Sequence, residues 1–69
     1  MKAQVISNGV PVDVAITKRR WLAKKLCVLV VFGPENAQWM SVDDKLLILD
    51  KDQRKQISHL PWWDRKSRG

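Results

Sequence analysis

Five cations and one tryptophan fall within eight residues of this chain, in the segment KRRWLAKK at 18–25. A second stretch, PWWDRKSRG at 61–69, adds three cations and two adjacent tryptophans. Cations neutralise phosphates and release condensed counterions, exposed aromatic rings stack on unpaired bases, and Arg fits phosphate and guanine edges. The two segments therefore predict a surface that binds nucleic acid, either DNA or RNA, mainly through phosphates and with low sequence specificity.

The charges are segregated along the chain. Its 13 Lys and Arg against 7 Asp and Glu give a net charge of +6. Residues 18–25 carry +5 and residues 51–69 carry +4, whereas residues 26–50 carry −3 and residues 1–17 are neutral. Such a distribution predicts two basic contact regions around a more apolar middle. The predicted nucleic-acid-binding residues are Lys18, Arg19, Arg20, Lys24, Lys25, Arg54, Lys55, Trp62, Trp63, Arg65, Lys66 and Arg68.

The residues that could carry out catalysis are few. His59 is the only histidine and Cys27 the only cysteine, and Cys27 lies in the apolar run LCVLVVF, where a small buried side chain is expected. His59 is expected at a helix end or in solvent. The paired Asp43 and Asp44 are typical of a turn, and no metal-ligand motif or glycine-rich phosphate loop accompanies them. We predict no enzyme activity, no metal and no cofactor.

The first elements that must position these residues are strands. Asn8-Gly9 is the preferred dipeptide of a type I′ turn, and apolar residues alternate with others over 10–17, which together predict a hairpin. Pro11 lacks a donor and should place this part of the strand at an edge or make it irregular. Residues 18–26 are expected to form a short helix or a basic loop. Residues 26–33 predict a central strand buried on both faces.

The second half of the chain predicts two further strands and a helix. Gly33-Pro34 begins a turn, residues 37–42 and 45–50 read as strands, and residues 52–60 read as a short helix capped by Asp52 and stopped by Pro61. The fold class expected is mainly β: a small antiparallel sheet or an SH3-like barrel of about five short strands with one short C-terminal helix. Residues 1–64 would form one domain, and residues 65–69 a frayed basic tail.

Strand spacing and basic flanks make the chain similar, in architecture, to SH3-like nucleic-acid-binding barrels such as the carboxy-terminal domains of retroviral integrases. In so small a domain the large aromatic rings of Trp21 and Trp39 are expected in the core. Trp62 and Trp63 should face opposite ways if extended, one packed against the sheet and the other exposed.

The same residues leave a second function class open. A short chain with an exposed Trp pair and many Arg is also typical of a protein-binding adaptor or inhibitor, such as a mobile-element or phage-type regulator that docks an acidic partner protein. A barrel could close within one chain or across a homodimer. The longest apolar run, 26–32, is too short to span a membrane, and MKAQVISNG has no secretory character. With one cysteine, a reducing, cytoplasmic setting is expected.

Overall fold

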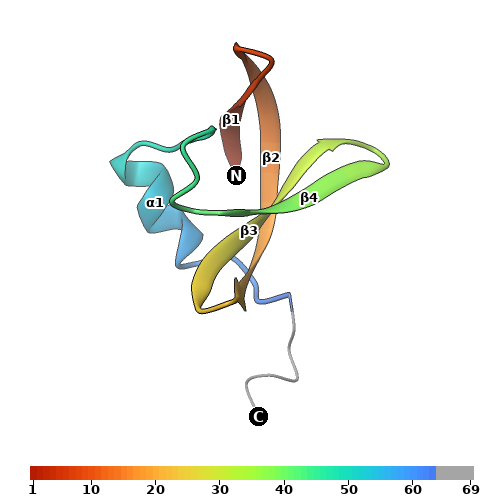
Figure 1. Ribbon diagram of the computed structural model, residues 1–69. Coiled ribbons are helices and arrows are strands. Elements are labelled where there is room, and N and C mark those ends of the chain that lie inside the picture. The colour runs from red at the N-terminus through yellow and green to blue at the C-terminus, as the bar shows by residue number, and fades with distance from the viewer. Residues whose placement is uncertain (64–69) are drawn as a thin grey trace.

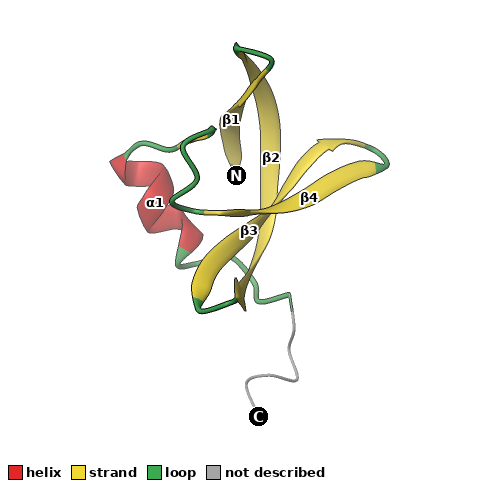
Figure 2. Cartoon of the chain, in the orientation of Figure 1, coloured by secondary structure: helices red, strands yellow, loops and turns green. Residues whose placement is uncertain are grey.

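Residues 1–63 are described by the computed structural model, which has a five-stranded antiparallel sheet and one short helix (Figures 1 and 2). The strand order is β4-β3-β2-β1-β5, and no pairing joins β4 to β5 within residues 1–63, so the sheet is open. This confirms the mainly β fold with five strands and a C-terminal helix. The predicted boundary after residue 64 lies outside the described residues. The elements are β1 (Lys2–Ser7), β2 (Val10–Leu22), β3 (Lys25–Gly33), β4 (Asn36–Ser41), β5 (Leu47–Ile48) and α1 (Lys51–Ile57).

The first hairpin forms as the sequence predicts. Asn8 and Gly9 have φ of 53° and 79°, the left-handed values that a type I′ turn requires of both central residues. Pro11 pairs with Ile6, next to the turn-closing pair, at a position where the backbone nitrogen faces away from the partner strand. Because β3 pairs with β2 only from Ala15 onward, no strand needs the donor that Pro11 lacks. The predicted local edge is confirmed.

The prediction of a helix or loop over residues 18–26 is wrong. β2 continues for 13 residues to Leu22, turns at Ala23-Lys24 and returns as β3. Ala23 and Lys24 have φ of 51° and 65°, so two residues that disfavour the left-handed region close a second two-residue hairpin. Pairing of both strands within the sheet outweighs the local preference of these residues.

The region from β4 to α1 departs from prediction at its boundaries. β4 forms as expected, but only Leu47 and Ile48 of the strand predicted over 45–50 pair with β1. The Asp44 carboxylate accepts a hydrogen bond from the backbone N–H of Leu46, at 2.9 Å, which keeps that residue in a turn. Asp50, not Asp52, caps α1: its side chain and that of Gln53 form a reciprocal capping box. The helix ends at Ile57, four residues before Pro61.

The core is built from small aliphatic side chains on one face of the sheet. Ile16, Val28 and Val30 are fully buried, and Ile57 of α1 packs with them. These positions alternate along β2 and β3, as expected for strands with one face against a core. No tryptophan belongs to this cluster, so the aromatic rings are left for other parts of the described surface.

Candidate nucleic-acid interface

A β-bulge in β2 sets which face each basic residue occupies. Ile16 pairs with Val30, but Arg19 pairs with Val28, so β2 has one residue more than β3 across this interval. The extra residue reverses the alternation of side chains between the faces. Arg19 therefore shares the face of the core residue Val28, whereas Arg20, paired with Cys27, lies on the opposite face.

The C-terminal segment joins β2 as a short parallel strand at Arg19. The backbone N–H of Arg19 donates to the carbonyl of Pro61 at 3.1 Å, and the N–H of Trp63 donates to the carbonyl of Arg19 at 2.8 Å. The Arg19 side chain adds a third bond, from Nε to the carbonyl of Leu60 at 2.8 Å. β1 pairs with β2 only as far as Ala15, so this segment covers an edge that β1 leaves open.

This junction gathers aromatic rings and guanidinium groups on both faces of β2. The Arg19 guanidinium lies 4.0 Å from the ring centroid of Trp62, a distance that allows a cation–π contact. On the other face, Trp63 meets Trp39 edge-to-face at 5.8 Å, and the Arg20 guanidinium lies 5.3 Å from the Trp39 ring. The two adjacent tryptophans thus point to opposite faces, as predicted for an extended pair.

The prediction that Trp21 and Trp39 lie in the core is wrong, and so is the prediction that one of Trp62 and Trp63 is buried against the sheet. Trp21 is 61% exposed, and Trp62 and Trp63 are 37% and 48% exposed, so neither member of the pair is enclosed by the sheet. Trp39 is half-buried and lies on the face opposite the core cluster. The physical reason is that valine, isoleucine and leucine fill the core, while the segment 61–63 pairs along an edge of β2 instead of crossing the core face.

The predicted cations fall into three groups. The first group gathers at the end of the β2–β3 hairpin, where segment 61–63 also docks, and it comprises Lys18, Arg19, Arg20, Lys24 and Lys25. Arg54 and Lys55 lie on α1, and Arg54 is 3.9 Å from the carboxylate of Asp43. Arg65, Lys66 and Arg68 lie outside the described residues. We call the hairpin end, with its five cations and Trp21, Trp39, Trp62 and Trp63, the basic–aromatic end.

Two members of the basic–aromatic end, Trp21 and Trp39, are not predicted as surface residues by the sequence. Trp21 and Trp39 were expected in the core, yet Trp21 is exposed and Trp39 contacts Arg20 and Trp63. If residues 18–22 are taken as extended, Trp21 falls on the same face as Arg19. That alternation was the available signal.

The surroundings of Cys27 and His59 do not form a reactive site within residues 1–63. Cys27 is buried, with its Sγ 3.7 Å from the carbonyl of Lys25. His59 is exposed just after α1. Within residues 1–63 no three His, Cys, Asp or Glu side chains group as metal ligands would. No helix of the described chain is long and apolar enough to cross a membrane.

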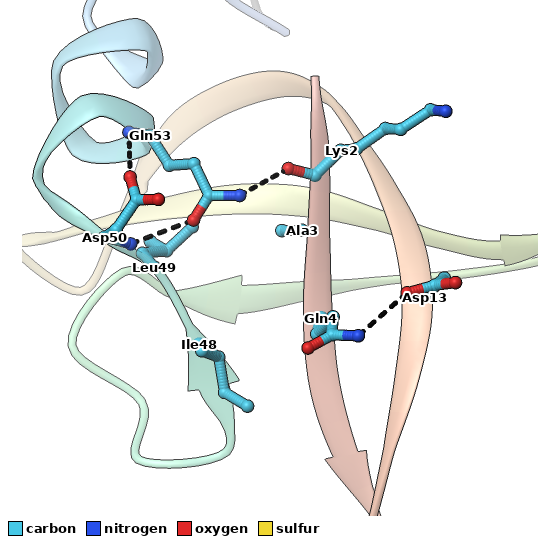
Figure 3. Close-up of a pocket in the computed structure, with 8 residues that line it drawn as sticks. All are labelled: Lys2, Ala3, Gln4, Asp13, Ile48, Leu49, Asp50 and Gln53. Atoms are coloured by element: carbon cyan, nitrogen blue, oxygen red, sulfur yellow. Dashed lines mark hydrogen bonds between the residues drawn. The ribbon is translucent and has the colours of Figure 1, made fainter.

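A shallow pocket of about 430 Å³ lies away from the basic–aromatic end, between β1, β5 and the start of α1 (Figure 3). Hydrogen bonds within the fold hold the side chains of Gln4, Asp50 and Gln53. Gln53 donates to the carbonyl of Lys2 at 2.7 Å, and Gln4 donates to Asp13 at 2.9 Å. These hydrogen bonds already occupy Gln4 and Gln53, so the basic–aromatic end, where five cations gather, is the better candidate site.

The comparisons with known proteins add no relative: no protein-family model matches the sequence, and neither a curated protein nor a solved structure matches it.

Proposed function

We propose that this protein binds nucleic acid through the basic–aromatic end, mainly by contacts to phosphates and without strong sequence specificity. The observation that carries the proposal is the gathering of five cations and three exposed tryptophans at one end of the sheet. Residues 14–34 contain no Asp or Glu, so no acid in the part of β2 that pairs with β3 offsets those charges. A polyanion is the partner that such a surface attracts most strongly.

The arrangement of the cations supports backbone contacts more than base reading. Lys24 and Lys25 are exposed at the turn, where ammonium groups on flexible stems can follow a phosphate chain. Arg19 uses its Nε–H on the Leu60 carbonyl, which fixes its charge beside the docked segment. Each neutralised phosphate releases condensed counterions, so affinity should depend steeply on salt.

The test is fluorescence anisotropy of labelled single-stranded and duplex oligonucleotides at 50 and 200 mM salt. With about four to six phosphates neutralised, log K should fall against log salt with a slope of about −4 to −5 on duplex DNA, a loss of about 250- to 1,000-fold. A flat salt response, or no binding at 50 mM, would sink the proposal.

A matched pair of triple variants locates the contact. Lys18→Gln, Lys24→Gln and Lys25→Gln together should make the duplex slope shallower by about 2 to 3, since each phosphate contact contributes about 0.9. The control triple, which changes Lys2, Lys45 and Lys51 to Gln, removes the same charge from exposed positions outside the predicted contact set. Equal effects of the two triples would mean that net charge, and not this end of the hairpin, governs binding.

A second candidate function, a protein-binding adaptor or inhibitor that occupies a larger partner, is favoured by the exposed tryptophan pair. Trp and Arg dominate interface hot spots. Trp62 and Trp63 leave 37% and 48% of their surface open, and Trp62 lies against Arg19. The double variant Trp62→Ala, Trp63→Ala separates the two functions. Loss of a protein complex with retained folding would support the adaptor. Oligonucleotide binding that both the wild type and this folded variant retain would support the first proposal.

A further inference from the structure

We infer that the nucleic acid is single-stranded and that Trp21 is the ring on which an unpaired base stacks. This inference rests on the proposed function, whose partner class it narrows. Trp21 is the most exposed tryptophan of the described chain, at 61%, and it sits one residue before the end of β2. A large ring left in water at that position adds nothing to the core cluster.

Each of the other three tryptophans has an aromatic or guanidinium partner within residues 1–63. Trp62 lies beneath Arg19, and Trp39 and Trp63 meet edge-to-face, with Arg20 near the Trp39 ring. Within residues 1–63, Trp21 has neither an aromatic nor a guanidinium contact of this kind. Across the ladder it faces Leu26, at the margin of the core. Its ring is therefore the one most available to a ligand.

The surroundings of Trp21 suit a base that is attached to a phosphate chain. Arg19, two residues back and about 7 Å along the strand, shares its face, and its parallel pairing places Trp62 on that face too. The turn cations Lys24 and Lys25 follow within four residues. A chain whose phosphates run along the turn would bring its bases over Trp21.

An exposed ring such as that of Trp21 can reach the faces of bases in a single strand but not those in a duplex. In a duplex the base faces are stacked inside the helix, and a protruding ring cannot reach them without unstacking a step. In a single strand each base can splay toward an aromatic ring, and such stacking tolerates any base. Stacking on Trp21 is thus compatible with low sequence specificity. It also adds a contribution to the binding free energy that salt does not screen.

The experiment compares Trp21→Ala with Val10→Ala, which truncates an apolar side chain of similar exposure at the opposite end of β2. The probes are labelled oligo(dT), oligo(U) and a DNA duplex of equal length. We expect wild type to favour the single strands, and Trp21→Ala to lose about 5- to 100-fold on them but less than about twofold on the duplex. Trp21→Phe should retain most of the affinity, and Val10→Ala all of it. The two single-stranded arms distinguish DNA from RNA.

Several outcomes overturn the inference while leaving the proposed function intact. The first is equal affinity of the wild type for single strands and duplex. The second is that Trp21→Ala loses affinity equally on both kinds of probe, or loses none. In each case the steep salt dependence is retained. A flat salt response on all probes would instead overturn the proposed function itself. If Trp21→Ala does not fold, the indole N–H resonance of Trp21 in the wild-type protein decides: a large shift on adding oligo(dT) but not duplex supports stacking, and an unmoved resonance contradicts it.

Discussion

Each end of β2 is joined to its neighbouring strand by a two-residue turn with left-handed φ values, but the two turns are made of different residues. At one end Asn8 and Gly9 form the hairpin turn, and at the other Ala23 and Lys24 form a turn with the same left-handed φ values. Asn and Gly adopt this conformation readily, whereas other residues lose roughly 1–2 kcal/mol there. The second turn is therefore held by the pairing of β2 with β3 and not by its own sequence.

The same two ends differ in what they expose. The Asn8-Gly9 end presents Val10 and Val12 with few charges, whereas the Ala23-Lys24 end presents Trp21 among five cations. Strained backbone often accompanies functional positions, because the surrounding structure must impose it. The less favourable turn therefore lies at the end of β2 that carries the candidate site.

The largest loss of stability is expected from truncation of Ile16, a residue of the core that supports both ends of β2. Ile16 lies between them, fully buried, and truncation to Ala should lower the free energy of unfolding by about 2–5 kcal/mol. Because one core supports both hairpins, denaturation followed by tryptophan fluorescence and by far-UV circular dichroism should shift together. Ile48→Ala, at a position 43% exposed, is the control and should cost far less. Loss of the fluorescence transition alone would show that the two ends unfold independently.

An intermediate effect is expected from Arg19→Lys, which keeps the charge but removes the Nε donor and the planar group. The variant loses the bond to the Leu60 carbonyl and the contact with Trp62, so unfolding should become easier by about 1–2 kcal/mol. Tryptophan emission should shift to the red as segment 61–63 detaches from β2. Arg20→Lys, which has a longer contact with Trp39, should change both readouts less. The same response from both variants would contradict the role given to Arg19.

The smallest changes in stability are expected from single substitutions in the two hairpin turns. Asn8→Ala should destabilise the protein by about 1 kcal/mol, whereas Ala23→Asn should stabilise it by about 0.5–1 kcal/mol, because Asn tolerates the left-handed region. Neither substitution changes the charge. The urea midpoint of each variant measures the effect. A fall in midpoint for Ala23→Asn would show that the second turn is not strained.

The sequence predicts most of the elements, and its failures have physical causes. Asn8-Gly9 identifies the first hairpin because its residues match the turn they form. Ala23-Lys24 carries no such signal, and the bulge after Ile16 interrupts the alternation that would have revealed a strand at 18–22. The helix was predicted, but its start was missed because Asp50 and Asp52 are both acceptable caps and only the reciprocal bond with Gln53 distinguishes them.

The sequence predicts the cations of the candidate site and two of its tryptophans, Trp62 and Trp63, but it does not predict Trp21 and Trp39 there. The five cations of 18–25 are adjacent in sequence, so a local pattern is enough to group them. The contacts of Arg19 with Leu60 and Trp62 join residues more than 40 positions apart, which no local pattern specifies. Residue type alone places Trp21 and Trp39 in the core, and alternation along an extended segment places one of Trp62 and Trp63 against the sheet. In the structure, the pairing of segment 61–63 with an open edge of β2 decides where Trp62 and Trp63 lie.

The most direct test of the account is a ¹H–¹⁵N chemical-shift titration of the intact chain with a short oligonucleotide at 50 mM salt. If the basic–aromatic end binds the oligonucleotide, shifts should concentrate in residues 18–25 and 61–63, including the indole N–H of Trp21, and the resonances of residues 5–12 should not move. Shifts centred on the Asn8-Gly9 end, or shifts spread evenly over both ends, would contradict it.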